Sequence, residues 1–363
     1  MPQPNDNATK PHGTTTMHTN TRLVTLLLIL FTAFGCSKGP DTGEGEVVLY
    51  SSVDQALLME IVTDFETQTG IRVRLVGDNE ANKTTGLVQR LLMEKDRPSA
   101  DVWWSSEPFG TIRLEREGVL KPYHSQAGED SIEGGWPKLL KGRTWYGFAL
   151  RARVLVYAPG RVDTPPESVL DLTDPKWKGR IGMAQPAFGT TRGHMGILVD
   201  AWGEDGFRAW LEAMKANGLR LYDGNATIVR AVRLGEIDIG LTDTDDVWVG
   251  QRNRWKVEPI FEKQGIERLG LTSMGPVLLP NTVAMVAGGP NPDNAARLID
   301  YLLSERVEIL MAESDSRNIP VHPNLQERFK SLMVEDPAEF DLSAVTDKIE
   351  DAMNICQQVL GGP

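Results

Sequence analysis

The sequence has few of the residues that would indicate a disulfide framework, a zinc site or a nucleic-acid-binding surface. It contains two cysteines and five scattered histidines in 363 residues. Neither a disulfide framework nor a zinc site is therefore predicted. Acidic side chains outnumber basic ones, 50 to 38, and the formal net charge is -12. Such a charge argues against a nucleic-acid partner and favours either a soluble protein or cationic ligands.

The motifs of common catalytic sites are absent as well. The sequence has no Gly-x-Ser-x-Gly nucleophile elbow and no phosphate-binding P-loop. His194 follows Arg192 by two residues without a partner that spacing identifies, and we interpret it as an ordinary helix residue. We predict that the protein is not an enzyme. The less favoured alternative is a secreted hydrolase whose paired carboxylates act on a sugar.

The apolar run near the N-terminus is short. Leu23 to Phe34 (LVTLLLILFTAF) follows Arg22 and falls below the roughly 20 residues that span a bilayer. A short apolar run after a basic residue is typical of a signal peptide. We predict a signal peptide with extra N-terminal residues over 1–35, and Met17 as a start would give it an ordinary length.

Cys36 follows this run in a context that resembles a bacterial lipobox. Small residues flank Phe34, although Ala33 stands where a leucine is usual. We predict that Cys36 is lipidated and that residues 36–46, rich in glycine and acidic residues, form a tether. The protein is then exported to the periplasm or cell surface and held at the membrane by lipid. Ordinary secretion with an incidental cysteine is the alternative.

The mature chain alternates short apolar strands with amphipathic helices. Helices are expected from Leu57 to about Gly70, over 190–202 and 205–217, and between Asn225 and Gly235. Expected strands cover 47–52, 71–76, 100–104, 153–157, 181–183, 237–241, 276–280 and 282–286. This order predicts an α/β fold with parallel crossovers and an open sheet.

The same pattern predicts two α/β lobes with a ligand cleft between them. We expect the chain to cross between the lobes near Leu150 and Pro280. Lobe 1 then comprises residues 47–150 plus 281–318, and lobe 2 residues 151–280. The remaining residues, 319–363, are expected to be C-terminal helices that pack on the lobes.

An acidic cluster follows one of these strands. Asp243, Asp245 and Asp246 come directly after the strand 237–241, and Asn225 is a good N-cap for the preceding helix. The ligand crevice of open α/β sheets lies at the carboxyl ends of the strands. Because carboxylates are hard oxygen donors, the cluster predicts a cation site. A solvated acidic turn is the alternative.

Three other loops are expected to face the same cleft. They contribute hard oxygen donors and, in the third loop, a helix N-terminus with two hydroxyl groups and a guanidinium that would suit an anion. A plain capped helix with an exposed arginine is the alternative for that third loop. The candidate residues are Ser52 and Asp54, then Ser106 and Glu107, then Gly189, Thr190, Thr191 and Arg192.

From about Val47 to Pro323 the chain resembles bacterial periplasmic solute-binding proteins of the ferric-ion-binding type, which serve ABC importers. The resemblance lies in LYSSVDQALLMEIVTDFETQTGIRV, ADVWWSSEP, DPKWKGRIGMAQP, GNATIVRAVRLGEIDIGLTD and IPVHP. It implies a type II periplasmic binding fold, whose two lobes close on a solute by a hinge. It also implies a monomer that delivers its solute to a permease with an ATPase subunit.

The resemblance also bears on the ligand. The family's two adjacent iron-binding tyrosines fall on Asp245 and Asp246, and a histidine of its first loop falls on Asp54. A family glutamate falls on Ser106 or Glu107. The cation half of the site therefore departs from the family pattern.

The anion half of the site is retained, since the family's anion loop falls on 188–191 and its anion-contacting asparagine on Asn225. We expect Fe(III) or a similar hard cation, carried as cargo rather than as a cofactor, with a synergistic anion. The alternative ligand is an organic phosphate, a phosphonate or another zwitterion, with its amine on the aspartates. A sensor or scaffold subunit that feeds no permease is a further alternative.

Overall fold

The computed structural model describes residues 45–78 and 84–361. The predicted signal peptide, Cys36 and the tether up to residue 44 lie outside the described residues. Within the described part, no helix is both long and apolar enough to cross a membrane.

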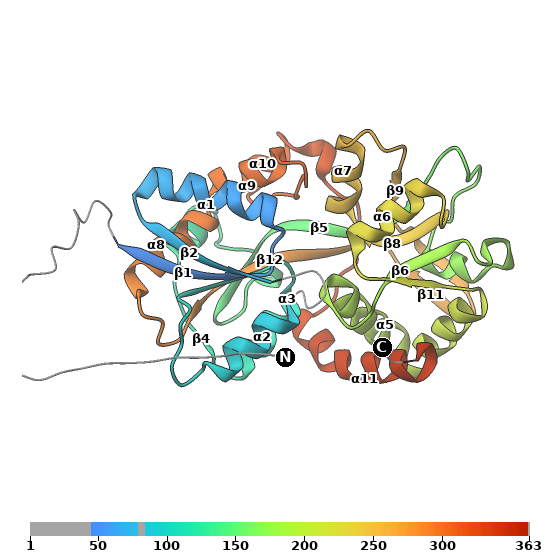
Figure 1. Cartoon of the computed structure of the whole chain (residues 1–363), viewed down its shortest axis with the longest axis horizontal. Coiled ribbons are helices and arrows are strands. Elements are labelled where there is room, and N and C mark those ends of the chain that lie inside the picture. Colours follow the sequence, from blue (N-terminus) through green and yellow to red (C-terminus); the bar gives the residue numbers. More distant parts are fainter. Residues whose placement is uncertain (1–44, 79–83, 362–363) are drawn as a thin grey trace, which may run out of the picture. The chain divides into compact units, whose positions relative to one another are not determined.

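The secondary structure alternates over most of the chain (Figure 1). The strands are β1 (Glu46–Ser51), β2 (Arg72–Gly77), β3 (Val102–Ser105), β4 (Leu120–Lys121), β5 (Trp145–Tyr157), β6 (Ile181–Ala184), β7 (Arg220–Tyr222), β8 (Ile239–Asp243), β9 (Glu258–Ile260), β10 (Gln264–Arg268), β11 (Leu271–Met274) and β12 (Val277–Val286). The helices are α1 (Gln55–Thr69), α2 (Thr85–Met93), α3 (Pro108–Arg116), α4 (Gln126–Glu129), α5 (Gly189–Ala216), α6 (Asn225–Leu234), α7 (Thr244–Arg252), α8 (Pro292–Leu302), α9 (Glu305–Glu313), α10 (Pro323–Gln326) and α11 (Leu342–Leu360).

One sheet runs through both lobes. Its strand order is β2-β1-β3-β12-β5-β8-β6-β7, with β4 added to β12 and β9 to β5. β1 is parallel to β2 and β3, and β6 is parallel to β7 and β8. The long strands β5 and β12 pair antiparallel between these two groups, as Figure 1 shows. They are the hinge strands of the two-lobed architecture.

The two hinge strands bend at the same level. Leu150 pairs with Pro280, and the register shifts between Pro280 and Asn281. The preceding Ala149 has a left-handed backbone (φ 44°), which is unusual for a residue with a side chain. Asn281 Nδ2 donates to the Ala149 carbonyl at 2.6 Å, and Glu308 accepts from the Ala149 amide at 3.1 Å. These contacts hold the bend in place.

Apolar faces of the helices bury the sheet on both sides. The amphipathic helix predicted from Leu57 to about Gly70 is confirmed as α1, whose Leu58, Ile61 and Phe65 are fully buried against β1 and its neighbours. Gly70 ends this helix in the left-handed conformation (φ 71°), which glycine adopts without steric cost. Each lobe thus has its own hydrophobic core.

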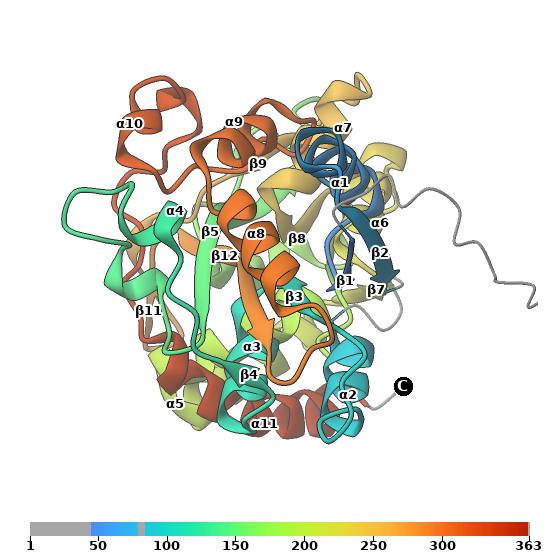
Figure 2. The ribbon, with the colours of Figure 1, turned by 90° about the vertical axis from the view of Figure 1, so that its left-hand side faces the viewer.

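The last helix, α11, contacts both cores. Val345 and Ile349 pack with the cluster around β1 and β3, whereas Ile355 and Val359 pack with the cluster around β6 and β8. Figure 2 shows α11 beside α5, along which it packs. The helix therefore extends across the boundary between the lobes.

Several elements differ from the expectation. α5 is one assigned helix, but Gly203 interrupts it with non-helical angles (φ 71°, ψ 168°), so the two predicted helices are its two parts. β12 is a single strand with a bulge where two strands were expected. α7 was not predicted, because its first turn was interpreted as an acidic loop.

Candidate functional site

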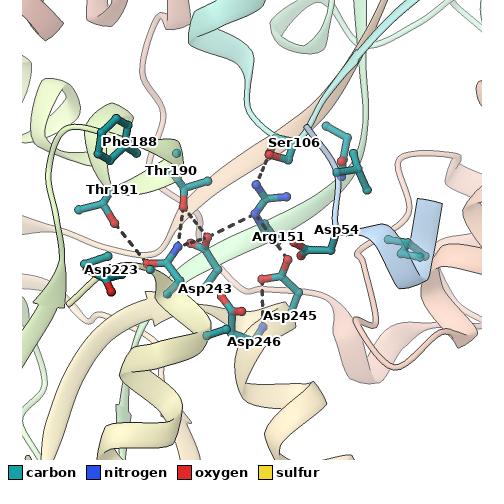
Figure 3. A pocket seen from close by; sticks show the side chains of 18 of the residues that line it. Asp54, Ser106, Arg151, Phe188, Thr190, Thr191, Asp223, Asp243, Asp245 and Asp246 are labelled. Carbon is teal, nitrogen blue, oxygen red and sulfur yellow. Dashed lines mark hydrogen bonds and ion pairs between the residues drawn. The ribbon is translucent and has the colours of Figure 1, made fainter. Parts of the chain in front are cut away.

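A cavity lies where the carboxyl ends of β1, β3, β6 and β8 meet the hinge strands (Figure 3). Its volume is about 50 Å³, well below the roughly 300–1,000 Å³ of sites for drug-sized ligands. The conformation described therefore suits a small ligand. The predicted ligand residues that line it are Asp54, Ser106, Gly189, Thr190, Thr191, Asn225, Asp243, Asp245 and Asp246.

Asp243, the last residue of β8, is buried in a network of donors. Arg153 Nη1 lies 2.8 Å from its Oδ1, while Thr190 Oγ1 (2.5 Å) and Asn225 Nδ2 (2.9 Å) donate to its Oδ2. Burial by itself would raise the pKa of Asp243, but Arg153 and Arg151 outweigh it and lower the pKa. Both carboxylate oxygens thus already accept from protein groups.

The neighbouring carboxylates lie in the first turn of α7. Asp245 Oδ1 accepts from the Asp246 amide at 3.1 Å, and Thr242 Oγ1 lies 3.4 Å from Asp246 Oδ2. Acidic side chains are favoured there by the partial positive charge of a helix N-terminus. Oxygens of Asp243, Asp245 and Asp246 all lie within 4.8 Å of one another, a spacing that could hold a metal ion. Metal ligation by the three remains a prediction.

Arg151 occupies the middle of the cavity, as Figure 3 shows. Its Nε lies 3.4 Å from Asp243 Oδ2 and 3.8 Å from Asp245 Oδ2, and its Nη2 donates to the Ser106 carbonyl. Burial would lower its pKa, but the surrounding aspartates, with Asp245 contributing most, raise it overall. Arg151 is therefore a fixed positive charge that contacts both lobes.

Sequence reasoning missed Arg151 and Arg153, although a signal for them exists. They stand two residues apart in an otherwise apolar strand, and alternate residues of a strand share one face. Two arginines on one buried face need nearby anions. Those anions are the aspartates at the ends of the neighbouring strands.

Arg153 also contacts a buried histidine behind the cavity. Its Nε lies 3.4 Å from His194 Nδ1. Burial, and then the charge of Arg153, lower the pKa of His194 to about 3. The imidazole is consequently neutral at physiological pH, and Nδ1 can accept this bond.

Two helix N-termini complete the other side of the cavity. α5 begins at Gly189 (φ 57°) and α6 at Asn225, and residues of both first turns line the wall. The first amides of a helix have no partner within the helix, so they suit an anion. Asn225 does not act as the predicted N-cap, because Gly224 takes that place. The Asn225 side chain bonds Thr190 and Asp243 instead.

The structure places three predicted ligand residues outside this cavity. Arg192 binds Glu350 of α11 at 2.6 Å and lines neighbouring pockets. Glu107 caps α3 by accepting from the amides of Phe109 and Gly110, and burial raises its pKa. Ser52 is buried and accepts from the Ser106 amide at 3.0 Å.

These three side chains bond other parts of the protein and are not among the residues that line the cavity. No tyrosine is among the described residues that line the cavity. The phenolate ligands of the resembled family therefore have no counterpart in its wall.

Comparison with known families and curated proteins gives consistent matches. The family described as bacterial extracellular solute-binding protein matches residues 47–313. Iron uptake protein A1 of Synechocystis sp. is 29% identical over 294 residues, which is 77% of this chain and 79% of that protein. The Fe(3+)-binding periplasmic protein of Serratia marcescens is 31% identical over 213 residues, 58% of this chain and 59% of that protein.

Two further matches bear on fold and ligand. A putative 2-aminoethylphosphonate-binding periplasmic protein of Salmonella paratyphi A is 25% identical over 79% of this chain and 82% of its own length. The crystal structure of the apo ferric ion-binding protein A of Pasteurella haemolytica superposes with a TM-score of 0.75 at 22% identity. It covers 88% of this chain and 98% of that one. The predicted two-lobed α/β fold is confirmed.

Proposed function

This chain belongs to the bacterial extracellular solute-binding proteins, and on that premise we propose that it captures Fe(III) or a similar hard cation with a synergistic anion. The cation would lie against Asp243, Asp245 and Asp246, with Asp54 beside them, and the anion against the first turns of α5 and α6. The captured solute is then delivered to the permease of an ABC importer. The relatives named for iron uptake and for Fe(3+) binding support this choice.

One observation carries the proposal: the ends of parallel strands bring a group of carboxylates and two helix N-termini to one small cavity. Oxygens of three aspartates lie within 4.8 Å of one another, and the amides that begin α5 and α6 line the same space. Carboxylate oxygens suit hard cations, and helix N-termini suit anions. A cation with a companion anion would therefore suit both the carboxylates and the helix N-termini of this cavity.

A second candidate ligand is an organic phosphate, a phosphonate or another zwitterion. Aspartates in place of tyrosines suit an ammonium group as well as a metal. The similarity to a putative 2-aminoethylphosphonate-binding protein supports this alternative. The small volume of the cavity, about 50 Å³, favours the cation with a small anion.

Membership of this family also suggests where the protein is located and which partners it has. We infer a periplasmic or cell-surface monomer, anchored by lipid on Cys36, whose partners are the permease and ATPase of the importer. Its role is binding rather than catalysis, and the cation is cargo and not a cofactor. Arg192 and Glu107 do not enter this site.

Native mass spectrometry with metal analysis tests the proposal on protein extracted gently from its own cells. We expect an added mass of one metal ion plus a small anion, with iron in the metal analysis. A bound organic phosphate would favour the second candidate ligand. Protein that carries neither a metal ion nor an organic phosphate would contradict both candidates. The same intact mass reports whether Cys36 is the acylated first residue.

A further inference from the structure

Asn318 is a polar residue of the cavity wall whose side-chain oxygen has no partner. The residue is 2% exposed and lines the cavity. Its Oδ1 is buried and accepts no hydrogen bond within the part of the chain that the structure describes. Buried polar groups are normally satisfied, and an acceptor left unpaired costs free energy. An unpaired amide oxygen in the wall of a ligand cavity therefore indicates a contact with the ligand.

The backbone holds this side chain in place. The backbone N–H of Asn318 donates to the Met311 carbonyl at 3.1 Å, and the next residue, Ile319, exchanges two hydrogen bonds of 2.7 Å with Leu150 of β5. In antiparallel pairing the residues beside such a pair, here Asn318 and Arg151, are cross-strand neighbours. Arg151 lies in the middle of the cavity, as Figure 3 shows. Asn318 therefore approaches the cavity from the hinge, next to Arg151.

The residues that precede Asn318 contact α7, the helix whose first turn carries two of the candidate cation ligands. Asp315 pairs with Arg252 of α7 at 3.1 Å. The Arg317 guanidinium lies 5.6 Å from the centre of the Trp248 ring on the same helix. Asn318 thus lies between a contact with α7 and a contact with the hinge strand, and it shares the cavity with the carboxylates of α7.

An amide oxygen is suited to the cation proposed above. Hard cations are bound by carboxylate oxygens and also by the side-chain carbonyl oxygens of asparagine. We propose that Asn318 is a ligand of the captured cation and contributes Oδ1 to its coordination shell beside Asp245 and Asp246. The inference rests on the proposed function. It adds to the aspartates a neutral oxygen donor from the segment that joins α7 to the hinge.

Terbium(III) luminescence in mildly acidic buffer tests this, because emission lifetimes in ordinary and in heavy water together count the water molecules on the bound ion. Asn318→Ala should bind the ion about tenfold more weakly and leave about one more water molecule on it. Asn318→Asp keeps an oxygen at this position and should retain the wild-type water count. Asn324→Ala is the matched control, because Asn324 bonds Glu305 at the surface; it should equal the wild type in affinity and water count.

A purely structural role of Asn318 predicts a different result. Asn318→Leu has a similar volume and removes the unpaired acceptor, so its melting temperature should equal or exceed that of the wild type while its terbium affinity falls. A loss of both stability and affinity in this variant would overturn the inference. Unchanged affinity of Asn318→Ala, or weaker binding at an unchanged water count, would also overturn it and leave metal capture intact. Absence of both terbium(III) and ferric citrate binding by the wild type would instead reject the proposed function.

Discussion

The buried pair Asp243 and Arg153 illustrates how single residues support this site without touching its ligand. Arg153 lies behind the cavity and neutralises Asp243, which in turn fixes Thr190 and Asn225. The first turns of α5 and α6 are thereby held in one orientation. We interpret Asp243 chiefly as an anchor and Asp245 and Asp246 as the ligand-facing carboxylates.

This pair predicts how stability depends on pH. The pKa of Asp243 is lower in the folded protein than in the unfolded chain, where it is about 3.9. Its contribution to stability is therefore complete above that value and is lost as the pH falls through the folded value. Asp243→Asn leaves Arg153 buried without its counter-ion and should cost about 3–5 kcal/mol at neutral pH.

Chemical denaturation at a series of pH values measures both effects. The unfolding free energy of Asp243→Asn should also depend less on pH than that of the wild type below about pH 4. Glu313→Gln removes an exposed pair with Arg328 and should change stability by at most about 1 kcal/mol. If both variants lost the same free energy of unfolding, the buried Asp243 network would contribute no more to stability than an exposed ion pair.

At the residue scale, the sequence predicted which side chains lie close together better than it predicted their individual contacts. As expected from their places at the ends of strands, Asp54, Ser106 and the aspartates at the end of β8 and the start of α7 line one cavity. Ligand binding by these residues remains a prediction. The partner of Arg192 could not be predicted, because Glu350 lies on α11, whose approach is set by tertiary packing that sequence spacing does not encode. The partners of Glu107 are local, since it caps α3 through the amides of Phe109 and Gly110, and the sequence analysis overlooked this capping position.

At the scale of elements, α11 is the part most relevant to lobe movement. It is bound to α5 of lobe 2 by two hydrogen bonds in particular. Arg208 donates to the Gln358 side chain, and Lys215 donates to the Val359 carbonyl. Toward lobe 1, Arg116 of α3 binds Asp347 at 2.6 Å and the Ser343 carbonyl at 2.8 Å. We infer that α11 moves with lobe 2, so that opening strains its contact with α3.

Arg116→Ala should therefore favour the open form. The pair is exposed, with 38% and 66% of the two side chains accessible, so its contribution is about 0.2–1 kcal/mol. Ligand affinity should fall by at most about fivefold, and small-angle scattering of the ligand-free protein should show a larger radius. Arg208→Ala removes a contact between α5 and α11 and should change neither the ligand affinity nor the radius. Equal effects of the two variants would contradict the inference that the contact between α3 and α11 favours the closed form.

Most of the helices and strands could be predicted from the sequence. Those that were not predicted, or were predicted with other bounds, have physical explanations. Gly203 interrupts α5 because glycine tolerates its left-handed angle, which is the break that the sequence suggested between 202 and 205. α7 was missed because its N-terminal aspartates are equally typical of a turn. The hairpin of β10 and β11 lies apart from the main sheet, and its sequences, QGIER and LTSM, lack the alternation of apolar and polar residues that indicates a strand.

At the scale of the whole molecule, the two hinge strands of the sheet also supply residues to the candidate site. Arg151 lies on β5, one of the hinge strands, and Asn281 of the other hinge strand both lines the cavity and bonds Ala149 at the bend. A ligand that contacts these residues would therefore act at the predicted hinge. Capture and closure are expected to be coupled, as in other proteins that close around a ligand by a hinge. The predicted lobe boundaries at 150 and 280 remain a prediction.

The central claim is that the α7 aspartates hold a hard cation in the cleft. Calorimetry with ferric citrate on the double variant Asp245→Ala/Asp246→Ala tests it most directly, with Glu204→Ala/Asp205→Ala, an adjacent exposed acidic pair on α5, as the matched control. The account predicts that the wild type and the control bind ferric citrate and that the α7 variant loses binding by at least about 100-fold, or about 2.7 kcal/mol. Undiminished binding by the α7 variant, or tight binding of a phosphorylated metabolite in place of iron by the wild type, would contradict it.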